Sequence, residues 1–142
     1  MQEKIEKIEK EVPLKVLLIV DDEEEVRKLL MEYFQRQGFL VLEAENGELA
    51  LKVITDNIIP DAVITDLMMP KMNGLELCHS IRNHPDERIR SLPVIILSGE
   101  DPEIHRPVAE SAGANLFLEK PVNPKKLRDE IKKILGLRKE ED

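Results

Sequence analysis

Five short apolar runs, separated by segments of helical periodicity, extend along this chain. They occupy residues 15–20, 39–43, 61–65, 93–97 and 115–118. Parallel strands need crossover connections, so this alternation predicts an α/β fold with a parallel sheet and right-handed crossovers. The first, third and fourth runs are almost wholly apolar, which is typical of strands covered on both faces. The last run is short and the second carries Glu43, and both features suit an edge strand.

Helical segments are predicted between these runs, at about 23–37, 47–56, 74–84, 102–112 and 124–135. In the first segment, four apolar residues fall on one face and are expected to pack on the sheet: Val26, Leu29, Leu30 and Phe34. Asn46 and Asn123 are the expected N-caps of the second and fifth segments. Pro107 removes a backbone donor from the fourth segment, so we expect that helix to begin near Arg106 or to be distorted.

The length of 142 residues fits one domain. We divide the chain into a charged N-terminal extension at 1–13, one domain at 14–137 and a charged tail at 138–142. Within the extension, Ile5, Ile8 and Val12 recur at helical spacing. That spacing fits a short amphipathic helix, and the charge of the extension fits a solvated arm equally well.

The net charge of −8 restricts the expected partners. A globally acidic chain is a poor candidate for binding the phosphate backbone of nucleic acids. No stretch approaches the ~20 apolar residues of a membrane span, and the N-terminus has no apolar signal core. The single cysteine, Cys78, excludes an internal disulfide and is expected to be a small buried side chain. We therefore expect a cytoplasmic protein with no direct nucleic-acid partner and no membrane partner.

Polar residues follow four of the apolar runs. They are Asp21 and Asp22, Asp66, Ser98, and Lys120. In an open parallel α/β sheet the carboxyl ends of the strands share one edge, where ligands bind. These five residues are therefore expected to meet in one pocket. Three crowded carboxylates repel each other unless a cation holds them, which points to a hard divalent metal beside a phosphoryl site.

Each of these residues also has an ordinary structural explanation as a cap or a turn residue. Their chemistry nevertheless fits a phosphoryl site. Asp66 can take up a phosphoryl group as an acyl phosphate. Lys120 can neutralise phosphoryl charge, Ser98 can donate to a phosphoryl oxygen, and Gly99 leaves space and a free backbone N–H. The order of acid pair, single acid, hydroxyl and Lys-Pro, each after the right strand, is specific, and it favours a phosphoacceptor site.

Four stretches of the chain resemble a known family. They read Val-Leu-Leu-Ile-Val-Asp-Asp-Glu from Val16, Thr-Asp-Leu-Met-Met-Pro-Lys-Met-Asn-Gly from Thr65, Val-Ile-Ile-Leu-Ser-Gly from Val94 and Phe-Leu-Glu-Lys-Pro from Phe117. Over about residues 14–137 the chain resembles the response-regulator receiver domains of two-component signalling, chemotaxis receivers among them. The resemblance implies a flavodoxin-like fold, a doubly wound five-stranded parallel sheet of order 2-1-3-4-5 with helices on both faces.

The same resemblance implies a signalling function. Asp66 would accept a phosphoryl group from the phosphohistidine of a sensor histidine kinase or a histidine phosphotransfer protein. Asp22, Asp66 and the backbone carbonyl of Met68 would ligate Mg²⁺ directly, with Mn²⁺ as an alternative, and Asp21 would contribute largely through water. The domain would catalyse only its own phosphorylation and dephosphorylation. It would then change conformation to control a downstream protein target, as a monomer or a weak homodimer.

The resemblance also assigns the residues around the phosphoryl group. Ser98, Gly99 and Lys120 would bind its oxygens. Ser98 and Phe117 hold the switch positions, and phosphorylation would draw the hydroxyl toward the phosphoryl group and let the aromatic ring move inward. Because Phe117 has no hydroxyl, its part in the switch would rely on packing alone. The Lys120–Pro121 peptide bond is expected to be cis, which X-Pro bonds alone allow at low cost.

Three other functions use part of this pattern. A Mg²⁺-dependent phosphatase of the haloacid-dehalogenase type needs an Asp-x-Asp pattern after the first strand, whereas here Asp21 is followed by Asp22 and Glu23. A receiver that is never phosphorylated is disfavoured because the five polar residues are intact. A flavodoxin-like electron carrier is disfavoured because no Ser/Thr/Gly-rich phosphate loop follows the first strand and tryptophan is absent.

Overall fold

The computed structural model of this chain describes residues 14–137. The predicted extension at 1–13 and tail at 138–142 lie outside the described residues. Every helix in the described part is too short or too polar to cross a membrane.

The sheet has the predicted order. Its strands are β1 (Val16–Val20), β2 (Leu40–Ala44), β3 (Ala62–Asp66), β4 (Val94–Ser98) and β5 (Leu116–Glu119). Neighbouring strands pair in parallel in the order β2-β1-β3-β4-β5. The strand with Glu43 and the short strand β5 are therefore the two edges, as their sequences indicated. Four of the five strands end one residue later than predicted, so that Asp66 and Ser98 are the last residues of their strands.

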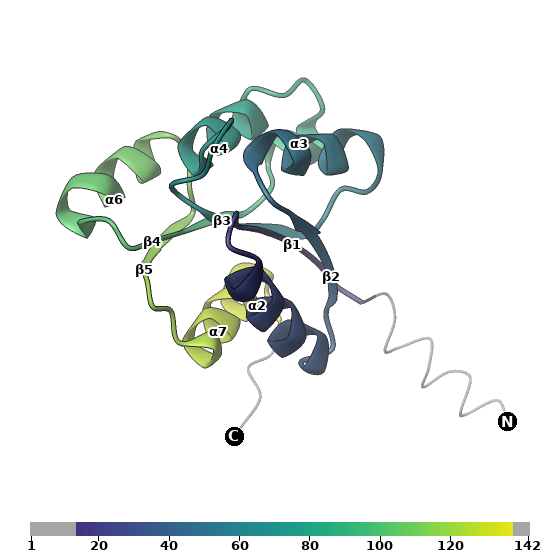
Figure 1. The fold of residues 1–142 in the computed structure, drawn as a ribbon. Helices are drawn as coiled ribbons and strands as arrows, with labels where there is room; N and C mark the ends of the chain where they lie inside the picture. The colour runs from purple at the N-terminus through teal and green to yellow at the C-terminus, as the bar shows by residue number, and fades with distance from the viewer. Residues whose placement is uncertain (1–13, 138–142) are drawn as a thin grey trace, which may run out of the picture.

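Helices cover both faces of this sheet. They are α2 (Glu24–Arg36), α3 (Gly47–Asp56), α4 (Gly74–Arg82), α5 (Glu87–Arg90), α6 (Pro102–Ser111) and α7 (Pro124–Ile134). In Figure 1, α3, α4 and α6 lie over one face, and α2 and α7 lie over the other. Asn46 and Asn123 cap α3 and α7 with their side chains, as predicted. The short helix α5 was not predicted, because four residues are too few to show a helical period.

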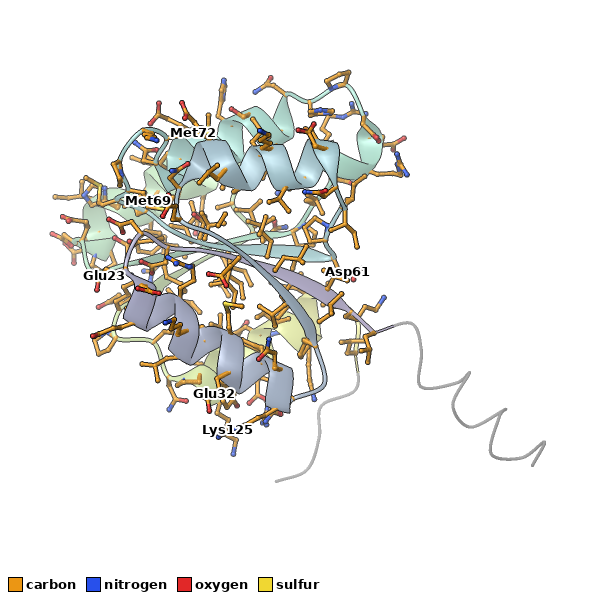
Figure 2. All side chains as sticks on the ribbon, turned by 45° about the vertical axis from the view of Figure 1, so that its right-hand side comes forward. Glu23, Glu32, Asp61, Met69, Met72 and Lys125 are labelled. Atoms are coloured by element: carbon orange, nitrogen blue, oxygen red, sulfur yellow. The ribbon has the colours of Figure 1, made fainter. Side chains whose placement is uncertain are left out.

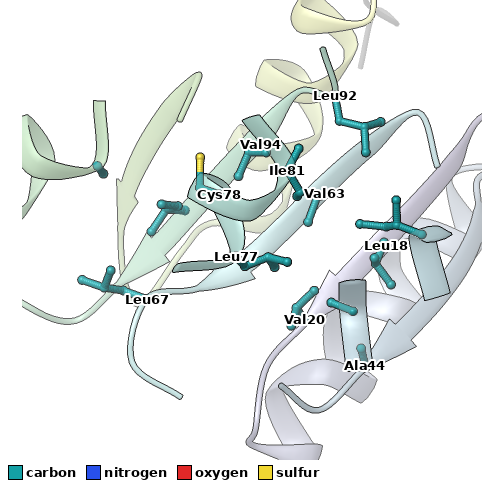
Figure 3. Close-up of a cluster of buried hydrophobic side chains, with 14 of the residues drawn as sticks. Leu18, Val20, Ala44, Val63, Leu67, Leu77, Cys78, Ile81, Leu92 and Val94 are labelled. Atoms are coloured by element: carbon teal, nitrogen blue, oxygen red, sulfur yellow. The ribbon is translucent and has the colours of Figure 1, made fainter. Parts of the chain in front are cut away.

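Two hydrophobic cores hold the layers together. Successive residues of a strand point to opposite faces, so Leu18 and Val20 enter one core, while Leu17 and Ile19 enter the other. The first core, part of which Figure 3 shows, lies beneath α3, α4 and α6 and contains Cys78, which is fully buried as predicted. The second core lies beneath α2 and α7. Burial on both faces explains why the central strands are almost wholly apolar.

One predicted core residue of α2 lies elsewhere. Leu30 and Phe34 are buried in the second core and Val26 packs at its margin, but 69% of Leu29 is exposed. Residues 26, 30 and 34 form one stripe along the helix, and Leu29 lies about 100° around the axis from Leu30. The prediction that Leu29 faces the sheet was therefore wrong.

The structure also excludes a late start for α6. The helix begins at Pro102, not near Arg106, and continues through Pro107 to Ser111. Asp101 caps its start by accepting a hydrogen bond from the Glu103 N–H at 3.0 Å. Pro107 removes only the N–H that would have reached the Glu103 carbonyl in the exposed first turn, so the helix tolerates it.

Candidate functional site

Three carboxylates meet at the carboxyl edge of the sheet. Asp21 and Asp22 follow β1, and Asp66 ends the neighbouring strand β3. Each of the three offers an oxygen, and these atoms all lie within 4.8 Å of one another. In Figure 2, Glu23 at the start of α2 and Met69 after β3 mark this end of the sheet, and Asp61 lies at the opposite end. The structure thus brings together acids that are far apart in the sequence.

Lys120 supplies a cation to this cluster. Its Nζ donates to Asp21 Oδ2 at 2.9 Å and lies 3.3 Å from Asp66 Oδ1. Burial lowers the pKa of Lys120, but its hydrogen bond to Asp21 and the charge of Asp66 outweigh burial, and the pKa rises. Lys120 is therefore a fixed positive charge beside Asp66, where sequence analysis placed it. The Lys120–Pro121 bond is cis, as expected.

Burial tunes the chemistry of Asp66. Loss of hydration raises the pKa of its carboxyl from 3.8 to about 6, and the charge of Asp21 adds to the rise. Lys120 and the Leu67 N–H, which donates to Asp66 Oδ1 at 2.9 Å, act in the opposite direction. At neutral pH the carboxylate is thus ionised but more basic than an exposed aspartate. Higher basicity of the ionised carboxylate favours nucleophilic attack.

The backbone of residues 66–67 packs closely against the start of α4. The Gly74 N–H donates to the Leu67 carbonyl at 2.8 Å. A Cβ atom at Gly74 would collide with the Asp66 carbonyl oxygen. The helix start is fixed by a reciprocal pair of bonds between Asn73 and Glu76. Glycine at this position therefore allows α4 to fix the loop that carries Met68.

The remaining predicted residues surround one cavity of about 260 Å³ next to Asp66. Its lining consists of Asp22, Glu23, Asp66, Met68, Ser98, Gly99, Glu100 and Lys120. Ser98 is 1% exposed, and its Oγ accepts a hydrogen bond from the Glu100 N–H at 2.9 Å. Gly99 leaves open space where a side chain would stand. The cavity is thus lined by four carboxylates, a hydroxyl, an ammonium group, a thioether and the backbone of a glycine.

Phe117 does not occupy an exposed position. It is 2% exposed, lies in the first core, and carries the guanidinium of Arg106 over its ring, with Cζ 5.6 Å from the ring centroid. The ring is therefore already buried in this structure, so the expected movement on phosphorylation would not begin from an exposed position.

The donor set fits a hard divalent cation. Mg²⁺ prefers oxygen ligands and commonly binds through one or two carboxylates together with phosphate oxygens and water. Asp22 is exposed to the cavity, whereas both carboxylate oxygens of Asp21 already accept hydrogen bonds, from Lys120 and from the Glu23 N–H. An ion in the cavity could therefore reach the carboxylate of Asp22, whereas both carboxylate oxygens of Asp21 are already engaged.

Sequence reasoning missed two contributors near this site. Glu23, which the sequence placed at the start of a helical segment and not in the site, lines the cavity. Arg27 donates through Nη1 to the Asp21 backbone carbonyl at 2.7 Å. Every residue has a backbone carbonyl, so a hydrogen bond to one requires no particular residue type as its partner. The sequence therefore offered no means of finding this contact.

The titration of Asp66 is expected to be visible directly. In metal-free protein its carboxyl carbon should titrate by NMR with a midpoint near the shifted pKa of about 6. Because the folded-state pKa lies above the unfolded one, the folded state binds more protons between 3.8 and about 6, and this group's stabilising contribution falls as pH rises through that window. Lys120→Met should raise the midpoint further. A wild-type midpoint at or below the ordinary aspartate value would contradict this assignment.

Comparison with known sequences identifies the family. The sequence model of the response regulator receiver domain matches residues 17–132. Chemotaxis protein CheY1 of Helicobacter pylori is 35% identical over 121 residues, which are 84% of this chain and 96% of CheY1. The alkaline phosphatase synthesis transcriptional regulatory protein PhoP of Bacillus subtilis is 33% identical over 121 residues, which are 85% of this chain and 48% of PhoP. The chain thus spans about half the length of PhoP and similar relatives.

Solved structures agree with this result. A CheY-like response regulator receiver domain protein from Methanospirillum hungatei superposes with a TM-score of 0.79 at 27% identity, covering 87% of this chain and 95% of that one. The chemotaxis response regulator CheY4 of Vibrio cholerae gives a TM-score of 0.76 at 28% identity, covering 86% of this chain and 99% of that one. The fold, the acid cluster and the sequence match lead to one conclusion: this chain belongs to the response regulator receiver domain family of two-component signalling.

Proposed function

We propose that Asp66 is the phosphoacceptor of this receiver domain, that Mg²⁺ is its cofactor, and that a histidine kinase or histidine phosphotransfer protein is its phosphodonor. The observation that carries the proposal is that Asp66 lies beside both Lys120 and the acid pair and lines a cavity of about 260 Å³ together with Asp22 and Lys120. Family membership excludes the phosphatase and the electron carrier. It leaves a receiver that is never phosphorylated as the alternative to test.

The proposed reaction is a phosphoryl transfer between two side chains. An oxygen of ionised Asp66 attacks the phosphorus, the bond from phosphorus to the histidine nitrogen breaks, and that nitrogen keeps the electron pair and takes a proton. Lys120 neutralises charge on the transferred group, and Ser98 donates to one of its oxygens. Asp22, Asp66 and the Met68 carbonyl would hold Mg²⁺ directly and Asp21 through water. The cation, when bound, supplies further charge neutralisation.

The test of this function is incorporation of labelled phosphate from acetyl phosphate, with Mg²⁺ and with excess EDTA. Incorporation that requires Mg²⁺ supports the phosphoacceptor, and none under either condition supports the receiver that is never phosphorylated. Hydrolysis of generic phosphate esters should be absent, since the domain acts only on its own acyl phosphate.

An apolar cleft beside the site fits the phosphodonor. A cavity of about 420 Å³ lies between α2 and the segment after β5. Glu23 and Lys120 line both this cavity and the 260 Å³ cavity next to Asp66. Its apolar lining is Val26, Leu29, Leu30, Leu97, Pro121, Val122 and Pro124. The exposed Leu29 on this rim gives a partner protein an apolar contact next to Asp66.

Leu29→Ser is expected to slow transfer from a phosphohistidine protein about ten-fold, because an apolar contact of roughly 1.4 kcal/mol is lost from the docked complex. Phosphorylation by acetyl phosphate should stay at the wild-type rate, since that donor is too small to use the cleft. Stability should change little because Leu29 is 69% exposed. Equal loss with both donors would show that the cleft does not serve docking.

Met68 is expected to lengthen the life of the acyl phosphate. It lines the cavity with 56% of its surface exposed, and a thioether cannot orient a water for in-line attack. Met68→Asn should release phosphate several-fold faster, because an amide can hydrogen-bond that water. Met68→Leu, which keeps the site apolar, is the control and should release at the wild-type rate. Equal or slower phosphate release from Met68→Asn would show that Met68 does not limit hydrolysis of the acyl phosphate.

The switch is proposed to begin at Ser98. Its Oγ accepts from the Glu100 N–H, and its own O–H can still donate to a phosphoryl oxygen. Moving Oγ toward that oxygen would shift or break the bond to Glu100 and so move the 99–101 loop. Phe117, buried under Arg106, would respond through packing. NMR shifts of Ser98 and Phe117 that are identical in free and beryllofluoride-treated protein would rule this switch out.

The names of the relatives bear on which downstream partner this domain controls. Several are named transcriptional regulators, and this chain matches about half of their length. The expectation of no direct nucleic-acid partner therefore stays a prediction for this domain, as do cytoplasmic localisation and a monomer or weak homodimer.

A further inference from the structure

Arg27 joins three parts of the fold beside the acid pair. It lies on α2 with 12% of its side chain exposed. Its Nη1 donates to the Asp21 carbonyl at 2.7 Å, and its Nε donates to Glu43 Oε1 on the edge strand β2 at 2.8 Å. The planar guanidinium makes both bonds at once, which a lysine ammonium on a single stem does with much poorer geometry.

The carbonyl that Arg27 holds belongs to the peptide unit between Asp21 and Asp22. That unit is planar, so fixing its oxygen fixes the plane and the position of the Asp22 Cα. The other polar groups of Asp21 are also held: its N–H donates to the Ala44 carbonyl at 3.2 Å, and its carboxylate accepts from Glu23 and Lys120. Asp21 is thus a buried anchor, and Arg27 fixes the direction in which the chain leaves it toward the exposed Asp22.

We propose that Arg27 is a positioning residue for the divalent cation, acting through the backbone that carries Asp22. The inference rests on the proposed Mg²⁺ site. Charge alone cannot explain a benefit, because a guanidinium near a bound cation opposes binding. The two explanations therefore predict opposite signs. Loss of Arg27 weakens Mg²⁺ binding if the residue acts by positioning, and strengthens it if only its charge matters.

The experiment is calorimetric titration of Mg²⁺ into wild type, Arg27→Met and Arg27→Lys at fixed pH and ionic strength, at a temperature where circular dichroism shows each protein fully folded. Partners that orient metal ligands typically contribute 10–100-fold in affinity, so Arg27→Met should weaken binding about ten-fold. The Mg²⁺ affinity of Arg27→Lys should lie between those of Arg27→Met and wild type. The amide resonance of Asp22 in metal-free protein should shift in both variants.

Arg36→Met is the matched control. Arg36 lies on the same helix, pairs with the exposed Glu32 at 2.6 Å, and carries the same charge. Glu32 lies well along α2 from Glu23, as Figure 2 shows. Mg²⁺ affinity in this variant should match wild type. A ten-fold loss here would overturn the inference, because it would trace the effect to the helix and not to the Asp21 carbonyl.

Unchanged or tighter Mg²⁺ binding by Arg27→Met overturns the positioning role. If Arg27→Met does not fold, Arg27→Lys decides: wild-type affinity with an unshifted Asp22 amide overturns the inference. Failure of the proposed function looks different. In that case wild type itself binds no Mg²⁺, or Asp22→Asn leaves its affinity unchanged.

Discussion

Asp66→Asn is expected to abolish phosphoryl incorporation from acetyl phosphate in the presence of Mg²⁺. A neutral amide is a far poorer nucleophile than a carboxylate and forms no stable acyl phosphate. The matched control is Asp61→Asn. Asp61 sits just before the other end of the same strand, where its carboxylate accepts the Val16 N–H at 2.7 Å, far from the cavity. Labelling of Asp61→Asn should match wild type, and labelling of Asp66→Asn at that level would defeat the assignment.

The same variant should be more stable than wild type at neutral pH. Burial holds the pKa of Asp66 at about 6, so above that pH the folded protein carries a charge that it solvates poorly. Asparagine removes this cost and leaves Lys120 paired with Asp21. The gain in Tm should shrink as the pH falls from about 6 toward 3.8, where wild-type Asp66 becomes protonated. A gain that grows on acidification would contradict the burial argument.

Asp22→Asn is expected to weaken Mg²⁺ binding by at least about ten-fold, and more than Asp21→Asn does. Asp22 is exposed to the cavity, whereas both carboxylate oxygens of Asp21 are engaged by Lys120 and Glu23. A direct ligand loses a bond on amidation, and a ligand that acts through water loses only part of its field.

Calorimetric titration of Mg²⁺ into Asp21→Asn and Asp22→Asn shows which of the two residues contributes more to the affinity. Glu24→Gln is the control, because Glu24 is an exposed acid in the same turn that pairs with Lys28 at 3.0 Å. It removes the same charge without touching the acid cluster and should bind Mg²⁺ as wild type does. A greater loss in Asp21→Asn than in Asp22→Asn would reverse the proposed roles.

Much of this site was predictable because topology and residue type act together. Apolar runs interrupted by amphipathic segments define a parallel sheet, and a parallel sheet collects its carboxyl ends at one edge. Asp66 and Lys120 could therefore be paired across 54 positions of sequence before any distance was known, and they lie 3.3 Å apart. The cap residues Asn46 and Asn123 were readable for a local reason, since a short polar side chain there satisfies free N–H groups.

The features that were missed share a different physical origin. Leu29 is apolar and lies three residues from Val26, so helical spacing includes it in the apolar arc, but spacing alone does not show that this edge of the arc lines a surface cleft and not the core. Pro107 was expected to delay α6, but the exposed first turn tolerates one absent donor. Arg27 acts on a main-chain oxygen, and the ring of Phe117 is covered by Arg106 from another element. Such contacts depend on the packed geometry and not on the local sequence.

The most direct test of the account is chemical identification of the phosphorylated residue. Protein treated with acetyl phosphate and Mg²⁺ is reduced with borohydride, which converts an aspartyl phosphate to homoserine, and peptides are then sequenced by mass spectrometry. The account predicts homoserine at position 66 alone, and none in protein that was not phosphorylated. Homoserine at position 21, 22 or 61 instead, or phosphate incorporated without homoserine at 66, would contradict it.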